Sequence, residues 1–284
     1  LFFTPSEYTF EHINSSKPSA QVKSGLLLAS LYHESFQTTI TEETPTRDHT
    51  ERMLSLMGVN LVRLGNSVTV EPKSKLKNID YNVPGDPSSA AFLIAIGVLR
   101  SKELNIQNVL LNERRIGFLK ILRKMNADIT IKDVEVQNNE NVGTIVVKKS
   151  KLKGVMVEGK DVADMVDEFP VFTLLASQAE GNTVVEGARE LRLKESDRIM
   201  AMENFILNLG GQINTSSNGY KISGIQKLQG GLIKTEEDHR IAMTGVVASL
   251  CINSEIKIDN TECISDSYPS FFSDLENIGA EYVS

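Results

Sequence analysis

The chain has 284 residues, of which 40% are hydrophobic and 24% charged, and its formal net charge is −7 at pH 7. These values are typical of a soluble globular protein with one large domain or two smaller ones. The acidic balance argues against broad nucleic-acid binding, and no apolar run reaches the roughly 20 residues that a membrane span needs.

The start of the chain and its cysteines and histidines set limits on location and cofactors. Leu1-Phe2-Phe3 offers neither a basic region nor an initiator Met, so we expect no signal peptide and either a processed chain or a piece of a longer one. Cys251 and Cys263 show no metal spacing and no disulfide framework, which indicates buried thiols and predicts a cytoplasmic protein. The four histidines form no metal-binding pattern, so we expect no metal.

The first part of the chain alternates between strand and helix signals. Residue spacing predicts strands at 7–13, 36–41, 59–63 and 68–71, and helices at 19–31 and 47–58. The stretch 72–84 carries prolines at both ends and several lysines but no clear pattern. We therefore place a domain boundary or hinge there and expect domains at 1–83 and 84–284.

The same order of elements returns three more times after this boundary. The predicted elements are a helix at 85–99, a strand at 104–109, a helix at 118–122, strands at 128–131 and 144–147, a helix at 166–179, a strand from Thr183, a helix at 196–209, a helix at 237–250, a strand at 255–258 and a helix at 268–272. This order indicates about four copies of one unit, which consists of a helix, a strand, a second helix and one or more strands. The first helix of each copy, such as 90–96, is apolar enough to be buried on most faces. The pattern predicts an α/β (α+β) fold of inside-out, barrel-like domains, with helices inside and sheets outside.

A charged run at 190–199 connects the strand at Thr183 to the next helix, with Ser196 or Asp197 as the expected N-cap. Lys194 and Arg198 at a helix start suit an anion, although such a run is also typical of a solvated, capped helix. Polar residues precede the other inner helices in the same way, as the pairs Ser19 and Gln21, Asp86 and Ser88, Asp167 and Glu168, and Asp238 and Arg240. If the units are arranged alike, several helix N-termini make one cleft electropositive.

Four of these stretches resemble the 5-enolpyruvylshikimate-3-phosphate synthase family. They are Arg47-Asp48-His49-Thr50-Glu51-Arg52-Met53-Leu54, Gly85-Asp86-Pro87-Ser88-Ser89-Ala90-Ala91, Lys194-Glu195-Ser196-Asp197-Arg198 and Asp238-His239-Arg240-Ile241-Ala242-Met243, in the family's order. The resemblance implies two similar domains, each of three repeated units. It also implies transfer of the enolpyruvyl group from phosphoenolpyruvate to the 5-hydroxyl of shikimate 3-phosphate, with release of phosphate, in the shikimate pathway of aromatic amino acid biosynthesis. The family uses no metal and no cofactor.

The resemblance begins at Ser19 and does not include the family's opening region. It therefore implies that residues 1–83 are the last part of the N-terminal, shikimate-phosphate-binding domain, and that 84–284 are the phosphoenolpyruvate-side domain of three units. Two alternatives remain open. In the first, the chain is a non-catalytic fragment that is active only with a separate N-terminal piece as its partner. In the second, it is the related enolpyruvyl transferase that acts on a UDP-sugar.

The resemblance also assigns roles to single residues. It implies that shikimate 3-phosphate is bound by Ser19, Gln21, Arg47, Asp167 and Lys194. It further implies that Arg198 and Arg240 hold phosphoenolpyruvate and that Asp167, Lys194 and Glu195 are the catalytic residues. Asp167 acts as acid or base near the 5-hydroxyl, while the proton steps of Lys194 and Glu195 stay unassigned.

Two positions depart from the family pattern. Ala20 stands where some members have Ser, and Asp266 stands where some have Lys. The second departure removes one positive charge from the phosphoenolpyruvate side.

Overall fold

The computed structural model describes residues 11–16, 18–32, 35–252 and 254–281, and its chain divides into two compact units. Unit 1 comprises Leu1–Val83 and Val136–Asn141, and unit 2 comprises Pro84–Glu135 and Val142–Ser284. The short segment Val136–Asn141 therefore groups with the first unit, although it lies far along the sequence. Of the strand expected at 7–13, residues 7–10 fall outside the described residues.

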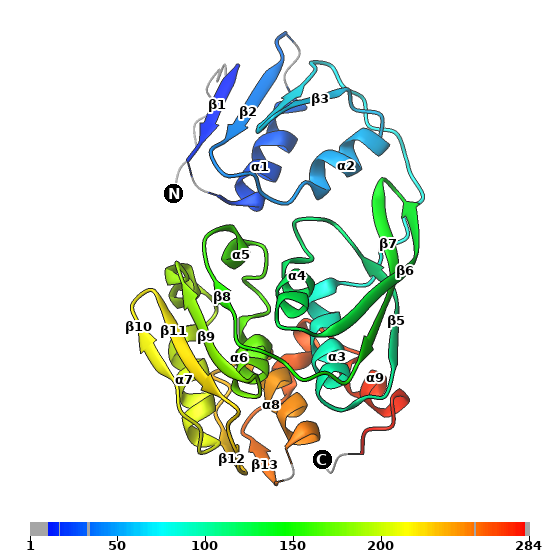
Figure 1. The fold of residues 1–284 in the computed structure, drawn as a ribbon. Coiled ribbons are helices and arrows are strands. Elements are labelled where there is room, and N and C mark those ends of the chain that lie inside the picture. Colours follow the sequence, from blue (N-terminus) through cyan, green and yellow to red (C-terminus); the bar gives the residue numbers. More distant parts are fainter. Residues whose placement is uncertain (1–10, 17, 33–34, 253, 282–284) are drawn as a thin grey trace. The chain divides into compact units, whose positions relative to one another are not determined.

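Unit 1 is a four-stranded sheet packed on two helices (Figure 1). Its elements are β1 (His12–Ser15), α1 (Ala20–Ser30), β2 (Thr38–Glu42), α2 (His49–Leu56), β3 (Leu61–Leu64) and β4 (Ser67–Val70). The strand order is β1-β2-β4-β3, with β1 parallel to β2 and the other pairs antiparallel. Leu27 of α1, Leu54 of α2 and Ile40 of β2 are buried in one small core, which joins both helices to the sheet.

Unit 2 contains the remaining elements. They are α3 (Pro87–Arg100), β5 (Leu104–Leu110), α4 (Gly117–Lys124), β6 (Asp128–Gln137), β7 (Glu140–Lys148), β8 (Met156–Val157), α5 (Lys160–Ala163), α6 (Phe169–Ser177), β9 (Gly181–Glu186), the 3-10 helix η1 (Arg189–Leu193), α7 (Arg198–Asn208), β10 (Asn214–Ser216), β11 (Gly219–Gly224), β12 (Gly231–Ile233), α8 (His239–Cys251), β13 (Ile256–Ile258), the 3-10 helix η2 (Glu262–Asp266) and α9 (Phe271–Asn277). Strands β6 and β7 reach into unit 1 at their connecting ends. The sheets have the orders β5-β7-β6, β10-β11-β9-β8 and β12-β13.

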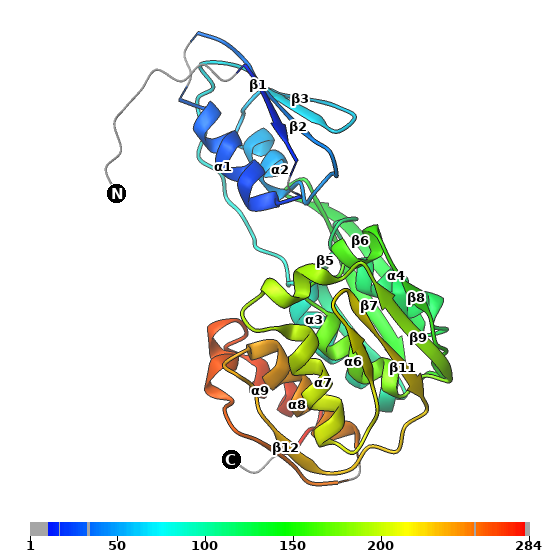
Figure 2. The same ribbon diagram turned by 90° about the vertical axis from the view of Figure 1, so that its left-hand side faces the viewer.

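Three helices form the interior of unit 2. Helices α3, α6 and α8 pack against one another, and each also packs on its own sheet, through β5, β11 and β13 respectively. Every residue of α6 is buried, and α3 and α8 are buried over most of their length. Each fully buried Phe or Leu side chain stabilises such a core by about 1.5–3 kcal/mol. Helices inside and sheets outside are therefore confirmed as the architecture of this unit (Figure 1 and Figure 2).

Helix α7 illustrates how local sequence sets an element's ends. Asp197 is its N-cap, since the Asp197 carboxylate accepts a hydrogen bond from the Met200 N–H at 3.1 Å. Just past its last turn, Gly210 adopts a φ of 74°, which favours glycine and ends the helix. Of the two expected N-caps, the structure selects Asp197. No helix within the described ranges is long and apolar enough to cross a membrane.

Candidate functional site

The starts of four helices meet in unit 2. Ser88, in the first turn of α3, donates a short hydrogen bond to Glu168, the N-cap residue of α6. Arg198, the first residue of α7, binds Asp167 just before α6 and Asp238, the N-cap of α8. The partial positive charges of these helix N-termini therefore add in one place.

Arg198 lies at the centre of this cluster. Its side chain is completely buried, and each of its three nitrogen atoms faces a carboxylate. The Nε atom lies 3.1 Å from Asp238, Nη1 lies 3.4 Å from Asp167 and Nη2 lies 2.6 Å from Glu195. A buried guanidinium is stable only with such partners, because an unpaired buried charge is costly.

Asp238 connects Arg198 to the helix that carries Arg240. Its Oδ1 accepts from the Arg240 N–H at 2.9 Å, and its Oδ2 accepts from the Ser196 hydroxyl at 3.0 Å. Burial by itself raises the pKa of the Asp238 carboxyl. The charge of Arg198 and these hydrogen bonds outweigh burial, so the pKa lies below its ordinary value and the carboxylate stays ionised.

Arg240 and Asp167 form the more accessible part of the cluster. Arg240 Nη2 lies 3.9 Å from Asp167 Oδ2, and the two side chains are 13% and 20% exposed. Glu195 is 54% exposed. The formal charges of this group balance, since Lys194, Arg198 and Arg240 are positive and Asp167, Glu195 and Asp238 are negative. Attraction for an anion must therefore come from the helix N-termini as well as from the side chains.

Burial shifts the pKa of two neighbouring groups toward their neutral forms. Burial raises the pKa of the Glu168 carboxyl, and the Ser88 hydrogen bond only partly offsets this. Burial also lowers the pKa of His239, and the positive charge of Arg240 lowers it further. Neutral forms of both side chains are thereby favoured next to the ionised cluster.

In unit 1, two of the predicted phosphate-binding residues, Ser19 and Gln21, lie at the start of α1. Ser19 is its N-cap, and the Ser19 hydroxyl accepts from the Val22 N–H at 3.3 Å. The same hydroxyl donates to the Gln21 side chain at 3.5 Å. Arg47 lies in the connection between β2 and α2. An N-terminal turn with a hydroxyl and an amide is chemically suited to a phosphate group.

A buried ion triad supports this part of unit 1. Lys23 Nζ lies 2.8 Å from Glu42 and 2.8 Å from Glu51, and all three side chains are at most 7% exposed. Glu42 also accepts from the hydroxyl and, at 3.4 Å, the backbone N–H of Thr46, directly before Arg47. The triad thus joins α1, α2 and the end of β2.

The family's sequence model, described as EPSP synthase (3-phosphoshikimate 1-carboxyvinyltransferase), matches residues 6–275. This chain belongs to the EPSP synthase family. A relative from Endomicrobium trichonymphae, named 3-phosphoshikimate 1-carboxyvinyltransferase, is 45% identical over 267 residues, covering 93% of this chain and 62% of its own length. A relative of the same name from Oceanobacillus iheyensis is 41% identical over 261 residues, covering 92% and 61%.

Solved structures agree with this family membership. EPSP synthase from Acinetobacter baumannii superimposes with a TM-score of 0.88 at 36% identity, covering 94% of this chain and 62% of that one. The enolpyruvyl transferase NikO from Streptomyces tendae, at 17% identity and a TM-score of 0.76, shares the fold. The chain spans about 61–62% of the length of these curated EPSP synthase relatives.

The structure brings together the residues predicted for unit 2 of this EPSP synthase family member. Asp167, Glu195, Arg198 and Arg240 are linked by ion pairs, and Lys194 is next to Glu195 in the chain. Ser19, Gln21 and Arg47 lie in unit 1. Sequence reasoning missed Arg115, whose guanidinium binds Asp86 and lies 3.0 Å from the Ser88 hydroxyl. It also missed the Lys23 triad, because its members are up to 28 positions apart and share no motif.

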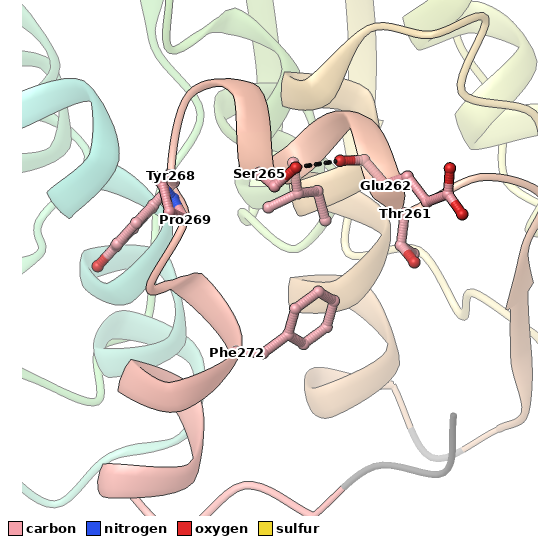
Figure 3. A pocket seen from close by; sticks show the side chains of 7 residues that line it. Thr261, Glu262, Ser265, Tyr268, Pro269 and Phe272 are labelled. Atoms are coloured by element: carbon pink, nitrogen blue, oxygen red, sulfur yellow. Dashed lines mark hydrogen bonds between the residues drawn. The ribbon is translucent and has the colours of Figure 1, made fainter.

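One pocket of unit 2 lies away from these residues. It has a volume of about 480 Å³ and lies between η2 and α9, where the Ser265 hydroxyl donates to the Glu262 carbonyl at 2.8 Å (Figure 3). Phe272 closes one side of it. None of the predicted site residues lines this pocket. Across the described ranges, no group of three or more His, Cys, Asp or Glu side chains is arranged to hold a metal ion.

Proposed function

We propose that this protein transfers the enolpyruvyl group of phosphoenolpyruvate to the 5-hydroxyl of shikimate 3-phosphate and releases phosphate. The meeting of four helix N-termini around Arg198, with Arg240 and Asp167 at its exposed side, carries this proposal. Relatives that are 41–45% identical carry the name of that reaction. The proposal needs no metal and no cofactor.

We assign phosphoenolpyruvate to Arg198 and Arg240 in unit 2. A guanidinium binds carboxylate and phosphate groups in a bidentate manner. Glu195 forms an ion pair with Arg198 Nη2 at a distance of 2.6 Å. The Glu195 side chain is 54% exposed, so it has room to move away from Arg198. A substrate carboxylate can therefore take the place of Glu195 on Arg198 and free the Glu195 side chain for proton transfer. Arg240 is accessible without such an exchange.

The proposed chemistry has two steps. In the first, Asp167 removes the proton of the 5-hydroxyl, the oxygen attacks C2 of phosphoenolpyruvate, and a proton is added to C3. In the second, the C2–phosphate bond breaks and the C3 proton leaves, which restores the double bond and releases phosphate. Lys194 and Glu195 are the groups that we assign to the two proton transfers at C3, in an order that we leave open.

We propose that shikimate 3-phosphate is bound by Ser19, Gln21, Arg47, Asp167 and Lys194. This makes unit 1 the shikimate-phosphate-binding domain and unit 2 the phosphoenolpyruvate-side domain of three repeated units. Support comes from the hydroxyl of Ser19 at a helix N-terminus and from the amide of Gln21 beside it. Asp266 adds no cation on the phosphoenolpyruvate side.

The span of the chain affects how the proposal is tested. The curated relatives are longer, since this chain covers 61–62% of them. We propose that activity requires the remaining family region, supplied either in the same polypeptide or as a separate N-terminal piece. We also propose a cytoplasmic location, which the free thiols of Cys251 and Cys263 support.

Phosphate release tests the reaction. The chain is incubated with phosphoenolpyruvate and shikimate 3-phosphate, alone and with an N-terminal family fragment, and a parallel set contains a UDP-sugar as acceptor. We expect release with shikimate 3-phosphate only, and only when the fragment is present. Full release from the chain alone would remove the need for a partner. Release only with the UDP-sugar, or none with folded components, would refute the function.

A further inference from the structure

The side chain of Lys194 has no polar partner among the residues that the structure describes. Its ammonium makes no hydrogen bond or ion pair within the described part of the chain, in contrast to Glu195 beside it, which binds Arg198 at 2.6 Å. Lys194 follows the last residue of η1 and has an extended backbone, with φ −90° and ψ −162°. The position of its ammonium therefore depends on how firmly the backbone between η1 and α7 is held.

The start of this connection is held by burial. Leu191 in η1 is fully buried, whereas Leu193 is 83% exposed and contributes little anchoring. Between Leu191 and the buried Arg198, Glu195 binds Arg198 and Ser196 donates to Asp238, and one further side chain crosses the connection. The residue that crosses the connection is Arg192.

The side chain of Arg192 links the two ends of the connection between η1 and α7. Its Nη1 lies 2.7 Å from Asp197 Oδ2, and its Nη2 donates to the Ser216 carbonyl on β10 at 2.6 Å. The second oxygen of Asp197 accepts from the Met200 N–H as the N-cap of α7. One planar guanidinium thus joins η1, the start of α7 and an outer strand, which a flexible ammonium cannot do in the same way.

We propose that Arg192 is a positioning residue that holds Lys194 in its working place. The inference rests on the proposed function, in which Lys194 acts on the reacting groups. Arg192 itself is not assigned to either substrate. It acts through the backbone, because a displacement of about 1 Å in a reacting group is enough to lower a rate by about 100-fold.

The test compares Arg192→Met with Arg189→Met. Arg189 is an exposed arginine of the same 3-10 helix and makes no hydrogen bond or ion pair among the described residues. Hydrogen exchange is measured on this chain, and kcat and KM are measured under the conditions in which the parent releases phosphate. For Arg192→Met we expect faster exchange at residues 193–197, a kcat lowered by about 10–100-fold and an unchanged thermal midpoint. Arg189→Met should match the parent.

A conservative variant separates positioning from general stability. Arg192→Lys keeps one positive charge but can hold only one of the two partners, so its kcat should lie between those of the parent and Arg192→Met. Normal exchange and normal kcat in Arg192→Met would overturn the inference, as would an equal loss in Arg189→Met. If the parent itself releases no phosphate with shikimate 3-phosphate, the proposed function fails and this inference fails with it.

Discussion

Arg198 and Asp238 are both completely buried, and the Arg198 Nε donates to Asp238 Oδ2 at 3.1 Å. The pair joins the first residue of α7 to the N-cap of α8. Because Asp238 also binds the Arg240 N–H, this single carboxylate orients the starts of both helices. The cluster around it is therefore part of the structural core as well as the proposed binding site.

Removing the Asp238 carboxylate should be costly. Asp238→Ala leaves Arg198 buried beside two weaker partners and removes the cap of α8, so we expect the free energy of unfolding to fall by about 3–5 kcal/mol. Urea unfolding monitored by circular dichroism measures this change. Glu113→Ala is the matched control, because Glu113 pairs with Lys120 at 2.8 Å on the surface and should cost less than about 1 kcal/mol. Equal losses in the two variants would contradict the special role of the buried pair.

Glu168 should make stability depend on pH. Burial raises the pKa of its carboxyl above the ordinary 4.5, and nearby Asp167 raises it further. The folded state therefore holds this proton more tightly than the unfolded state does. Its contribution to stability is fully present below the ordinary value and is lost as pH rises through the folded-state pKa.

Glu168→Gln removes the titrating carboxyl group but keeps an oxygen that can accept the hydrogen bond from Ser88. The free energy of unfolding of the variant, relative to the parent, should therefore rise as pH increases above 4.5 and then level off. Urea unfolding of both proteins between pH 4 and pH 8 gives the comparison. A difference that does not change with pH would show that Glu168 titrates as an ordinary carboxyl.

The inner helices were predictable because their sequences are almost continuously apolar, which is typical of helices buried on every side. Phe169–Ser177 has no polar face, and Asp197 and Gly210 mark the ends of α7 by well-understood backbone chemistry. The strands β10, β11 and β12 were not predicted, and β10 and β12 have only three residues each. Their existence depends on pairing with β11 and β13.

Strand β6 shows a second reason why a sequence-based prediction of secondary structure can be wrong. The prediction ended at Ile131, but the strand continues to Gln137. Asp133 has a φ of 53°, and the alternating apolar positions shift there from Ile129 and Ile131 to Val134 and Val136. A period of two cannot follow a strand across such a shift. In the candidate site, motifs located the charged residues, but partners such as Arg115 and Lys23 are fixed by tertiary packing alone.

The Lys23 triad should be important for the stability of unit 1. Lys23→Met leaves Glu42 and Glu51 buried without their shared cation, and Glu51 Oε2 already has no hydrogen-bond partner among the described residues. We expect the free energy of unfolding to fall by about 3–5 kcal/mol. Thermal unfolding and limited proteolysis of unit 1 measure the loss.

Two comparisons test the cause of that loss. Arg63→Met breaks the partly exposed pair with Asp48, whose atoms are 2.9 Å apart, and should cost less than about 1 kcal/mol. Changing both glutamates to Gln in the Lys23→Met background should recover part of the stability, since no unpaired charge then remains buried. No recovery would mean that lost packing, rather than lost charge pairing, explains the effect.

Arg240 should discriminate between the two substrates. Arg240→Ala removes an accessible cation that we assign to phosphoenolpyruvate, so the KM for phosphoenolpyruvate should rise by about 10–100-fold while that for shikimate 3-phosphate changes little. Steady-state kinetics with each substrate varied in turn measures both constants. Equal increases for the two substrates would place Arg240 elsewhere in the site.

Asp167 should be required for the chemical step rather than for binding. Its carboxylate lies 3.4 Å from Arg198 and 3.9 Å from Arg240, and Asn has nearly the same shape but cannot accept the hydroxyl proton. In an active preparation, Asp167→Asn should lower kcat by about 10²–10⁴-fold. Equilibrium binding of both ligands should stay close to normal, which separates a lost base from a damaged pocket. If kcat is unchanged, another group removes the proton, and Asp167 serves only to hold the two arginines in place.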